Sequence, residues 1–567
     1  MHAPARAAVL VAVALAVTAS TLAQAPTKEP TGSITGRVTI GGKPAPGVVV
    51  SLQPGQPGMA GPSPGAPAPK ATTDEDGRFR LTGVAAGQFT VTPIAPAFVL
   101  PNNNQYGQYG QPGKSITMAE GEAVEGVDFA LTRGGVIAGR VVDAEGRPII
   151  GERVELNLLD ERGQKRPVST YMNGPSMSET DDRGFYRLYG LQAGRYLVSV
   201  GVAKERGMVR MGGSRNYYPQ TFHPGVAEES LATVVEVKAG SEATNVDITL
   251  GRQVQGYDVS GRMVDEAGQP AAFATFGYGS VSNNGKSMGA FGFGLRTDTN
   301  GEFRIEGILP GSYAVFVASE GESEYYSDAV PFDVINQDIT GLEVKLRRGG
   351  SISGLAMVEG ATDPAALSAI QQLQLSAYTE SQDLSPPRIG SSQIGPDGGF
   401  RITGLRPGKV RISLSTFRGP KGFSLLRVER DGVAQRDGVE VAPGERVTGV
   451  RLVFAYGTAV VRGQVQVVGG TLPEGTRLFI STRRVGDSTP QGRSGGQVDD
   501  RGRFFIEGLA AGDYEIMLNV IPPPPVPGGG PPARPSFPPV KQTVTVAGAG
   551  ETPVILTIDL SQKEKEQ

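Results

Sequence analysis

The chain has 567 residues, and 54 lysines and arginines against 57 aspartates and glutamates give it a formal net charge of -3. Without a basic excess it lacks the field that holds a polyanion, so nucleic acid is not an expected partner. The sequence has 0 cysteines and 2 histidines, which excludes disulfides, lipid attachment through a thiol and metal sites built from cysteine and histidine.

Residues 1–25 have the order of a secretory signal peptide. A positive start ending at Arg6 is followed by an apolar run from Ala7 to Val17 and by small residues up to Ala25. The apolar run is shorter than the roughly 20 residues that a membrane span needs. We therefore expect cleavage after Ala25, export, and no membrane span after cleavage, with an uncleaved anchor as the alternative.

A pattern of turn, strand, turn and strand recurs five times at intervals of roughly 100 residues, which is the period of a domain repeat. Phe79 and Leu81 alternate with Arg78 and Arg80, so each strand is expected to bury one side. Two glycines then permit a tight connection, so the two strands form a hairpin or lie consecutively in two layers. The copies are DGRFRLTGVAAGQFTV from Asp76, RGFYRLYGLQAGRYLV from Arg183, NGEFRIEGILPGSYAV from Asn300, DGGFRITGLRPGKVRI from Asp397 and RGRFFIEGLAAGDYEI from Arg501.

Another shared strand lies about 40 residues upstream of each copy and contains a glycine, as in SITGRVT around Gly36. Gly36 is in phase with the apolar Ile34 and Val38, so it points inward. An inward glycine leaves room for a large side chain or a close backbone, and we expect the aromatic residue of the later repeated strand to fill it. A closing strand such as Val127–Leu131 ends each copy, and many short strands of this kind predict a sandwich of antiparallel sheets.

The G-R-V strand, the D-x-x-G-x-F-x-[LI]-x-G-[LI]-x-x-G-x-Y segment and the closing strand resemble the carboxypeptidase regulatory-like domain. This is a transthyretin-like (prealbumin-type) sandwich, related to the starch-binding-like and pilin B-type folds. The resemblance covers nearly the whole mature chain. It implies an all-β extended array of five tandem transthyretin-like antiparallel β-sandwich domains, with about seven strands each. It does not fix function, because this module hosts many roles.

Five module boundaries follow from the repeats. The short linkers, such as Arg133-Gly134-Gly135, predict limited relative orientations of neighbouring modules. After the signal peptide at 1–25, we place the modules at 30–133, 134–252, 253–348, 349–457 and 458–562.

His223 is the single histidine of the expected mature chain. A serine, histidine and aspartate site would have to use it, but its proline-flanked loop lacks the glycines of a nucleophile elbow. The alternative is a loop residue packed beside Tyr218 and Phe222. The metallopeptidase partner domain of the family has no counterpart here, so we expect no enzyme activity and no peptidase role.

Acidic residues precede the turn glycine of the repeats. Aspartate suits a tight turn, whereas a calcium site would also need a distal glutamate that the sequence lacks, so a turn role without metal or cofactor is expected, with calcium binding as the alternative. Pilin-type relatives cross-link through a lysine on a strand, but the first shared strand has none and Lys345 has no counterpart, so isopeptide bonds are not expected. The acidic residues are Asp74, Asp76, Asp181, Asp182, Asp298, Asp397, Asp499 and Asp500.

The loops after the second repeated strand contain aromatic residues that look exposed in three copies. On a rigid sandwich such side chains could bind a sugar or a peptide, although tryptophan, the usual sugar platform, numbers 0. The alternative is local packing over the end of the sandwich. The candidate ligand-binding residues are Tyr106, Tyr109, Tyr217, Tyr218, Phe222, His223, Tyr325 and Tyr326.

Two proline-rich stretches, Pro54–Pro69 and Pro522–Pro539, are typical of extended loops that serve as spacers or as docking sites for proteins. Together these features predict a non-catalytic binding or scaffold protein of the periplasm, the cell surface or the medium, with a protein or polysaccharide partner. A carbohydrate-binding protein that uses the loop aromatics is the alternative. An accessory protein of an extracytoplasmic hydrolase, or an enzyme, is more distant.

Overall fold

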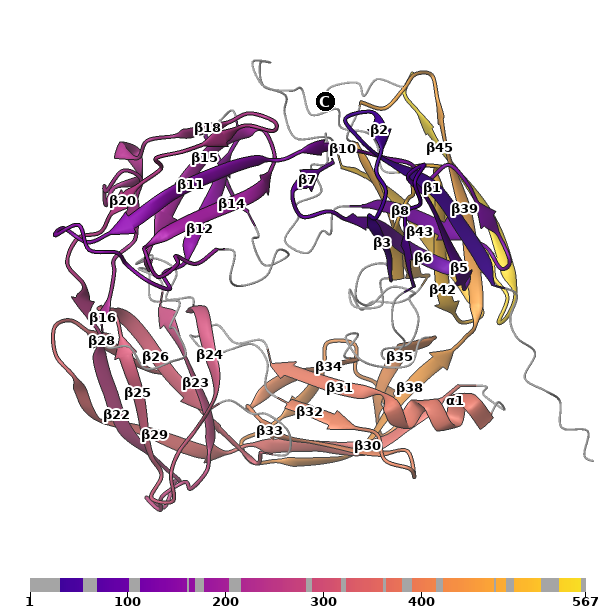
Figure 1. Cartoon of the computed structure of the whole chain (residues 1–567). Coiled ribbons are helices and arrows are strands. Elements are labelled where there is room, and N and C mark those ends of the chain that lie inside the picture. The colour runs from indigo at the N-terminus through magenta and orange to yellow at the C-terminus, as the bar shows by residue number, and fades with distance from the viewer. Residues whose placement is uncertain are drawn as a thin grey trace, which may run out of the picture.

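The computed structural model shows five β-sandwich modules that follow one another around a ring (Figure 1). The predicted signal peptide, most of the two proline-rich stretches, and Tyr106 and Tyr109 lie outside the described residues. The structure describes residues 31–54, 69–100, 113–160, 163–168, 178–202, 216–281, 288–317, 323–359, 364–379, 390–414, 422–473, 476–485, 494–521 and 540–561.

Each module contains two main sheets. Sheet I holds the first shared strand, the first strand of the repeated segment and the closing strand, and sheet II holds the second strand of the repeated segment. In module 1, sheet I consists of β1 (Gly32–Ile40), β2 (Lys43–Pro44), β5 (Arg78–Val84), β7 (Phe98–Val99), β9 (Ala123–Val124) and β10 (Phe129–Arg133). Sheet II of module 1 consists of β3 (Val49–Pro54), β4 (Lys70–Thr72), β6 (Gly87–Ile94) and β8 (Lys114–Met118).

Module 2 repeats this arrangement, and a small sheet joins its end to the start of module 3. Sheet I consists of β11 (Gly135–Val142), β14 (Phe185–Leu191), β19 (Glu242–Ala243) and β20 (Ile248–Thr249). Sheet II consists of β12 (Val154–Leu159), β13 (Lys165–Pro167), β15 (Gly194–Val200), β17 (Thr221–Phe222) and β18 (Val235–Val237). The small sheet pairs β16 (Asn216–Tyr217) with β21 (Val254–Gln255), and a short 3₁₀ turn spans Glu229–Leu231.

Modules 3 and 4 add one strand beside the closing strand, as β7 does in module 1. Module 3 has β22 (Tyr257–Val264), β25 (Glu302–Ile308), β27 (Tyr325–Ser327) and β29 (Ile339–Arg348) in sheet I, and β23 (Thr275–Val281), β24 (Met288–Arg296), β26 (Gly311–Val317) and β28 (Val330–Val334) in sheet II. Module 4 has β30 (Gly350–Val358), β33 (Gly399–Leu405), β35 (Phe423–Arg430), β36 (Val433–Ala434) and β38 (Arg446–Tyr456) in sheet I, and β31 (Gln374–Thr379), β32 (Gly390–Gln393), β34 (Gly408–Leu414) and β37 (Val439–Val441) in sheet II.

Module 5 ends the described chain, with β39 (Ala459–Val468), β42 (Arg503–Leu509) and β45 (Glu551–Asp559) in sheet I. Its sheet II consists of β40 (Arg477–Arg484), β41 (Ser494–Gln497), β43 (Gly512–Ile521) and β44 (Val540–Val546). Helix α1 (Pro364–Ala369) and the 3₁₀ turn Ile370–Gln372 lie between β30 and β31, outside the paired strands predicted from the repeats.

The repeated segment forms consecutive strands in the two layers, not a hairpin. In module 1, β5 pairs with β1 in sheet I, whereas β6 pairs with β3 in sheet II. Strand β5 is irregular at Gly83, just before the chain crosses between the layers, and the φ of 74° there is one that glycine adopts without steric cost. The alternation works as predicted, because Phe79 and Leu81 are buried while Arg80 between them is exposed.

The first shared strand of each module departs from the predicted antiparallel sandwich, and in modules 1 and 2 it has two parallel neighbours, β9 and β10 in the first and β19 and β20 in the second. The first shared strand runs parallel to the closing strand, as in the pairing of Val38 with Phe129 and of Gly463 with Val554. The chain reaches the closing strand by crossing over from sheet II, so no hairpin forces the two neighbours to run in opposite directions. The sheets are therefore mixed, with antiparallel pairs in the majority.

The inward glycine accommodates a different neighbour from the one predicted. A Cβ on Gly36 would lie 2.1 Å from the Val127 carbonyl oxygen and 3.0 Å from Phe79 Cε1. The space is thus taken by the backbone before the closing strand and by the aromatic residue directly across the sheet. The later aromatic belongs to the other sheet, and in module 2 the Tyr196 hydroxyl donates 2.7 Å to the Gln192 carbonyl and braces the turn.

Each module has its own hydrophobic core. The five buried clusters take their residues from 34–131, 137–250, 259–346, 352–454 and 459–558, and none of them combines residues from two of the predicted modules. The predicted array of sandwiches is therefore present, and it curves so that module 1, in indigo, lies beside module 5, in orange and yellow (Figure 1).

Glycines bring neighbouring modules close together at the linkers. A Cβ on Gly134 would lie 2.6 Å from Gly190 Cα, and one on Gly349 would lie 2.5 Å from the Gly404 carbonyl carbon. Each linker therefore packs backbone to backbone against the crossing turn of the following module. No larger residue fits at either linker position without moving that turn.

Candidate functional site at the module junctions

Tyr217 lies between modules 2 and 3 instead of in an exposed loop. It is 6% exposed and belongs to β16, where it pairs with Val254 of β21. Desolvation, together with the nearby Tyr217, raises the pKa of Tyr313 to about 12 and also raises the pKa of Tyr278, and both of these tyrosines belong to module 3. Because Val254 belongs to module 3, the pairing of β16 with β21 joins the two modules at Tyr217.

Tyr326 has the same role between modules 3 and 4. It is 8% exposed, and the Arg406 guanidinium of module 4 lies 5.2 Å from its ring centroid, in the range of a cation–π contact. Arg406 also donates to the Ser327 carbonyl and lies 3.5 Å from an Asp328 carboxylate oxygen. The neighbouring Tyr325 is 39% exposed.

The remaining described candidates lie close to the core of module 2. Phe222 is buried, and Tyr218 is half-buried against that core, where desolvation raises its pKa. The His223 imidazole is half-buried, and Nδ1 lies 2.6 Å from the Asp247 carbonyl oxygen. In the described part of the chain this is the one hydrogen bond of the imidazole, so neither a serine hydroxyl nor a carboxylate is paired with it.

The predicted exposure is therefore wrong for Tyr217, Phe222 and Tyr326. The sequence pattern of a single module contains nothing that would cover these rings. In the structure, the next module or the end of the sandwich covers them. Ligand binding by Tyr218, His223 and Tyr325 is untested and stays a prediction, as it does for Tyr106 and Tyr109 outside the described residues. The structure does not bring all the candidates together in one surface, since they fall at separate junctions.

The acidic turns hold their own backbone. Asp74 Oδ1 accepts hydrogen bonds from the amides of Asp76 and Arg78 at 3.0 and 2.7 Å, and Asp181 and Asp298 do the same in their modules. These bonds are what aspartate contributes to a tight turn. Among the residues that the structure describes, no group of three or more His, Cys, Asp or Glu side chains could hold a metal ion.

Asp499 has a further role that the sequence did not reveal. Oδ1 accepts the amides of Arg501 and Arg503 at 2.9 and 2.8 Å, like the other turn aspartates. Oδ2 accepts the amide of Thr117 in module 1 at 3.0 Å, and the carboxylate has no exposed surface. The turn of module 5 is thus docked on module 1.

Ion pairs surround this contact between modules 1 and 5. The Glu122 carboxylate lies 3.2 Å from Arg501 Nη1 and 2.6 Å from Arg503 Nη1, and Gln88 donates to the Gln497 carbonyl. Burial acts to raise the pKa of Glu122, but the hydrogen bonds from the Ala119 amide and Arg503 and the two positive charges keep that pKa below its usual value. These contacts close the ring.

The comparisons with known proteins give no family. No family model matches the chain, and no curated protein matches it. The search for long apolar helices covered only the described residues, and none of their helices is suited to crossing a membrane.

Three similar solved structures illustrate how distant the structural matches are. A streptococcal ancillary pilin is 13% identical over 56% of this chain and 99% of that chain, with a TM-score of 0.22. The Bacillus anthracis TIE protein is 12% identical over 72% of this chain and 68% of that chain, with a TM-score of 0.16. The major pilin subunit of Bacillus cereus is 12% identical over 54% of this chain and all of that chain, with a TM-score of 0.15. At TM-scores this low the matches carry no argument about function, and the all-β sandwich fold rests on the strand pairing itself.

Proposed function

We propose that this chain is a non-catalytic scaffold of the extracytoplasmic space, whose five carboxypeptidase regulatory-like modules form a closed ring. The observation that carries the proposal is the buried docking of Asp499 of module 5 on the Thr117 amide of module 1. A buried carboxylate is stable only when it is fully paired, so this contact is a specific one. The signal-like segment at 1–25 supports export.

The composition of the junctions supports a structural role over a catalytic one. Tyr217 and Tyr326 would be uncovered in a single module, and both are buried where two modules meet. The imidazole of His223, the one histidine after residue 2, is bound to a backbone carbonyl. Screening for hydrolase activity with His223→Ala as the comparison tests this part, and activity that the variant loses would overturn it.

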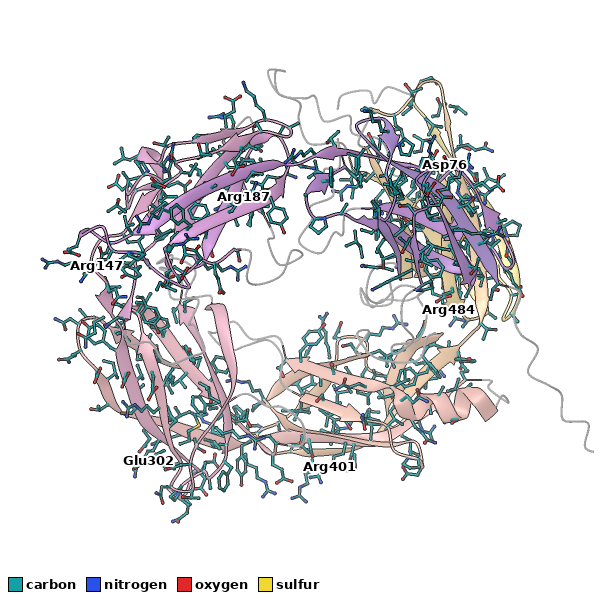
Figure 2. All side chains as sticks on the ribbon, viewed as in Figure 1. Asp76, Arg147, Arg187, Glu302, Arg401 and Arg484 are labelled. Carbon is teal, nitrogen blue, oxygen red and sulfur yellow. The ribbon has the colours of Figure 1, made fainter. Side chains whose placement is uncertain are left out.

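Crosslinking tests the closed ring. Because the chain has 0 cysteines, the double variant Lys114→Cys and Asp500→Cys places the only two thiols beside the contact, on modules 1 and 5, without replacing a residue that forms it. A flexible bismaleimide is expected to join them within one chain and to give a monomer of altered mobility in a denaturing gel. Lys114→Cys with Glu302→Cys is the matched control, because Glu302 lies across the ring (Figure 2). Equal crosslinking of both pairs, or crosslinks only between chains, would refute the closed ring.

Recognition of glycan through Tyr218 and Tyr325 is the second candidate function. Tyr325 favours it because its side chain is 39% exposed beside a fixed junction. Titration of soluble polysaccharides against the whole chain, with Tyr218→Ala and Tyr325→Ala for comparison, tests it. Binding that both variants retain would remove these residues from consideration.

A further inference from the structure

A cavity of about 420 Å³ lies at the junction of modules 1 and 2. Ile94 and Phe98 of module 1 and Val136 and Tyr189 of module 2 give it apolar walls, and Arg133 and Arg187 add two guanidinium groups. Its size falls in the range of small-molecule sites, roughly 300–1,000 Å³, which occur preferentially between domains.

The junction of modules 3 and 4 is built from the same backbone elements. The glycine after the closing strand donates its amide to the residue before the added strand, from Gly134 to Ala97 and from Gly349 to Glu324, at 2.9 Å in both cases. The added strand then pairs antiparallel with the closing strand, β7 with β10 and β27 with β29. Ala97 therefore occupies the place that Glu324 has in the other junction.

The arginines of the two junctions are equivalent as well. Arg133 is opposite Phe98 in the β7 pairing, and Arg348 is opposite Tyr325 in the β27 pairing. Arg187 and Arg401 hold the same place in the repeated segment, three residues before the glycine of the crossing turn, and Figure 2 shows them on modules 2 and 4. Each junction thus has the same pair of guanidinium positions.

The two junctions differ in the carboxylate between these arginines. At modules 3 and 4, the Glu324 carboxylate lies 3.3 Å from Arg348 and 3.2 Å from Arg401. At modules 1 and 2, alanine supplies no such group, and no hydrogen bond or ion pair joins the Arg133 side chain to a described residue. At modules 3 and 4 the Glu324 carboxylate therefore occupies the position between the two arginines. At modules 1 and 2 the equivalent position belongs to the cavity.

Among the described residues, Glu242 is the one carboxylate paired with the arginines of the cavity. Its two oxygens lie 3.1 Å from Arg187 Nε and Nη2, and hydrogen bonding to Arg187, with the charges of Arg187 and Arg133, lowers the pKa of Glu242. One carboxylate against two guanidinium groups leaves a positive surplus at the cavity. An anion is the complementary ligand.

We propose that the cavity between modules 1 and 2 binds a small carboxylic acid with a flat apolar body. Its carboxylate occupies the place of the Glu324 carboxylate, between Arg133 and Arg187. The apolar body packs against Phe98, Ile94 and the Tyr189 ring, which suit a flat group. This site lies at a different junction from the ring-closing contact, so the inference does not depend on the proposed scaffold role.

Calorimetric titration of the whole chain with phenylacetate tests the proposal. We expect saturable binding of one equivalent that weakens as salt is added, and no binding of phenylacetamide, which has the same body without the charge. Arg133→Gln should weaken binding at least about tenfold, because it removes a charge-assisted hydrogen bond. Arg262→Gln in module 3 is the matched surface control and should bind like the unaltered chain.

Ala97→Glu is the decisive variant, because it places a carboxylate where Glu324 has one. It should abolish phenylacetate binding and raise the melting temperature, whereas Glu242→Gln should tighten binding by freeing Arg187. Phenylacetate binding that survives Ala97→Glu unchanged would overturn the proposal. Equal affinity for the acid and its amide, or binding of glucuronate in preference to phenylacetate, would also overturn it.

Discussion

Replacing Asp499 by alanine tests how the ring is held closed. The Asp499 carboxylate accepts the amides of Arg501 and Arg503 within its own turn and the amide of Thr117 across the contact. Oδ2 also lies 3.1 Å from the Arg501 guanidinium, which bonds to the Thr117 carbonyl. The substitution removes the turn bonds and the bond between modules together.

Asp181→Ala separates these two losses. Asp181 makes the same turn bonds, at 2.9 and 2.7 Å to the amides of Arg183 and Phe185, and has no partner in another module among the described residues. The excess loss at Asp499 is the Thr117 bond together with the Oδ2 contact that holds Arg501 on the Thr117 carbonyl, and the Thr117 bond to a buried charged group alone contributes about 2 kcal/mol. That free energy lowers the ratio of closed to open rings by about 30-fold.

Fluorescence energy transfer between dyes on two exposed positions, Asp76→Cys of module 1 and Val485→Cys of module 5, measures this ratio during a salt titration, since salt weakens the ion pairs of the contact between these modules. We expect Asp499→Ala to open the ring at lower salt than either the unaltered chain or Asp181→Ala. Identical opening curves for Asp499→Ala and Asp181→Ala would refute the reasoning. A loss of transfer in Asp181→Ala would refute it too.

Three further predictions follow from the same contacts. Acid should open the ring, because the pKa of Glu122 is lowered in the closed state. The Glu122 carboxylate therefore stabilises the closed ring at pH values above the ordinary pKa of glutamate, and this stabilisation is lost as the pH falls through the lowered pKa. Desolvation raises the pKa of Asp500, so this residue acts in the opposite direction. Comparing the unaltered chain with Glu122→Gln in the transfer assay isolates the contribution of Glu122, and equal pH profiles would contradict the prediction. Gly36→Ala should destabilise module 1 by about 2–4 kcal/mol in chemical denaturation, because its Cβ would lie 2.1 Å from a backbone oxygen, and a loss below 1 kcal/mol would contradict this packing. Glu324→Ala should give the chain a second equivalent of phenylacetate binding by calorimetry, and an unchanged stoichiometry would argue against the equivalence of the two junctions.

The interior of each module could be predicted from the sequence because it depends on neighbours that are near in the repeat. Alternation within RFRLTG was enough to place Phe79 and Leu81 in the core, whereas the paired glycines predicted a tight connection without deciding between a hairpin and a crossing to the other layer. The direction of the closing strand was not predictable in this way. The alternation of buried and exposed residues does not depend on the direction of a strand, so the same residues fit a parallel or an antiparallel neighbour.

The junctions could not be predicted because they combine residues from different copies. Tyr217 and Tyr326 have the polarity and the loop setting of binding residues, and only the position of the next module shows that they are buried. Arg501 and Arg503 likewise look like ordinary turn residues until module 1 is placed beside them. The sequence does contain one useful difference, because Glu324 occupies the position that Ala97 has before the added strand of module 1. This difference can be interpreted only when the structure shows that the two junctions are equivalent.

The backbone contacts of Gly134 and Gly349 have a consequence for how such a chain can evolve. Joints packed backbone to backbone restrict rotation, so the total turn of the chain, and with it closure, depends on the number of modules. Duplicating or deleting a module would leave the first and last domains out of reach of each other, however well each domain folded. Selection for a closed ring would therefore keep the number of modules constant. The chain would change by substitution at its joints more readily than by gain or loss of whole modules.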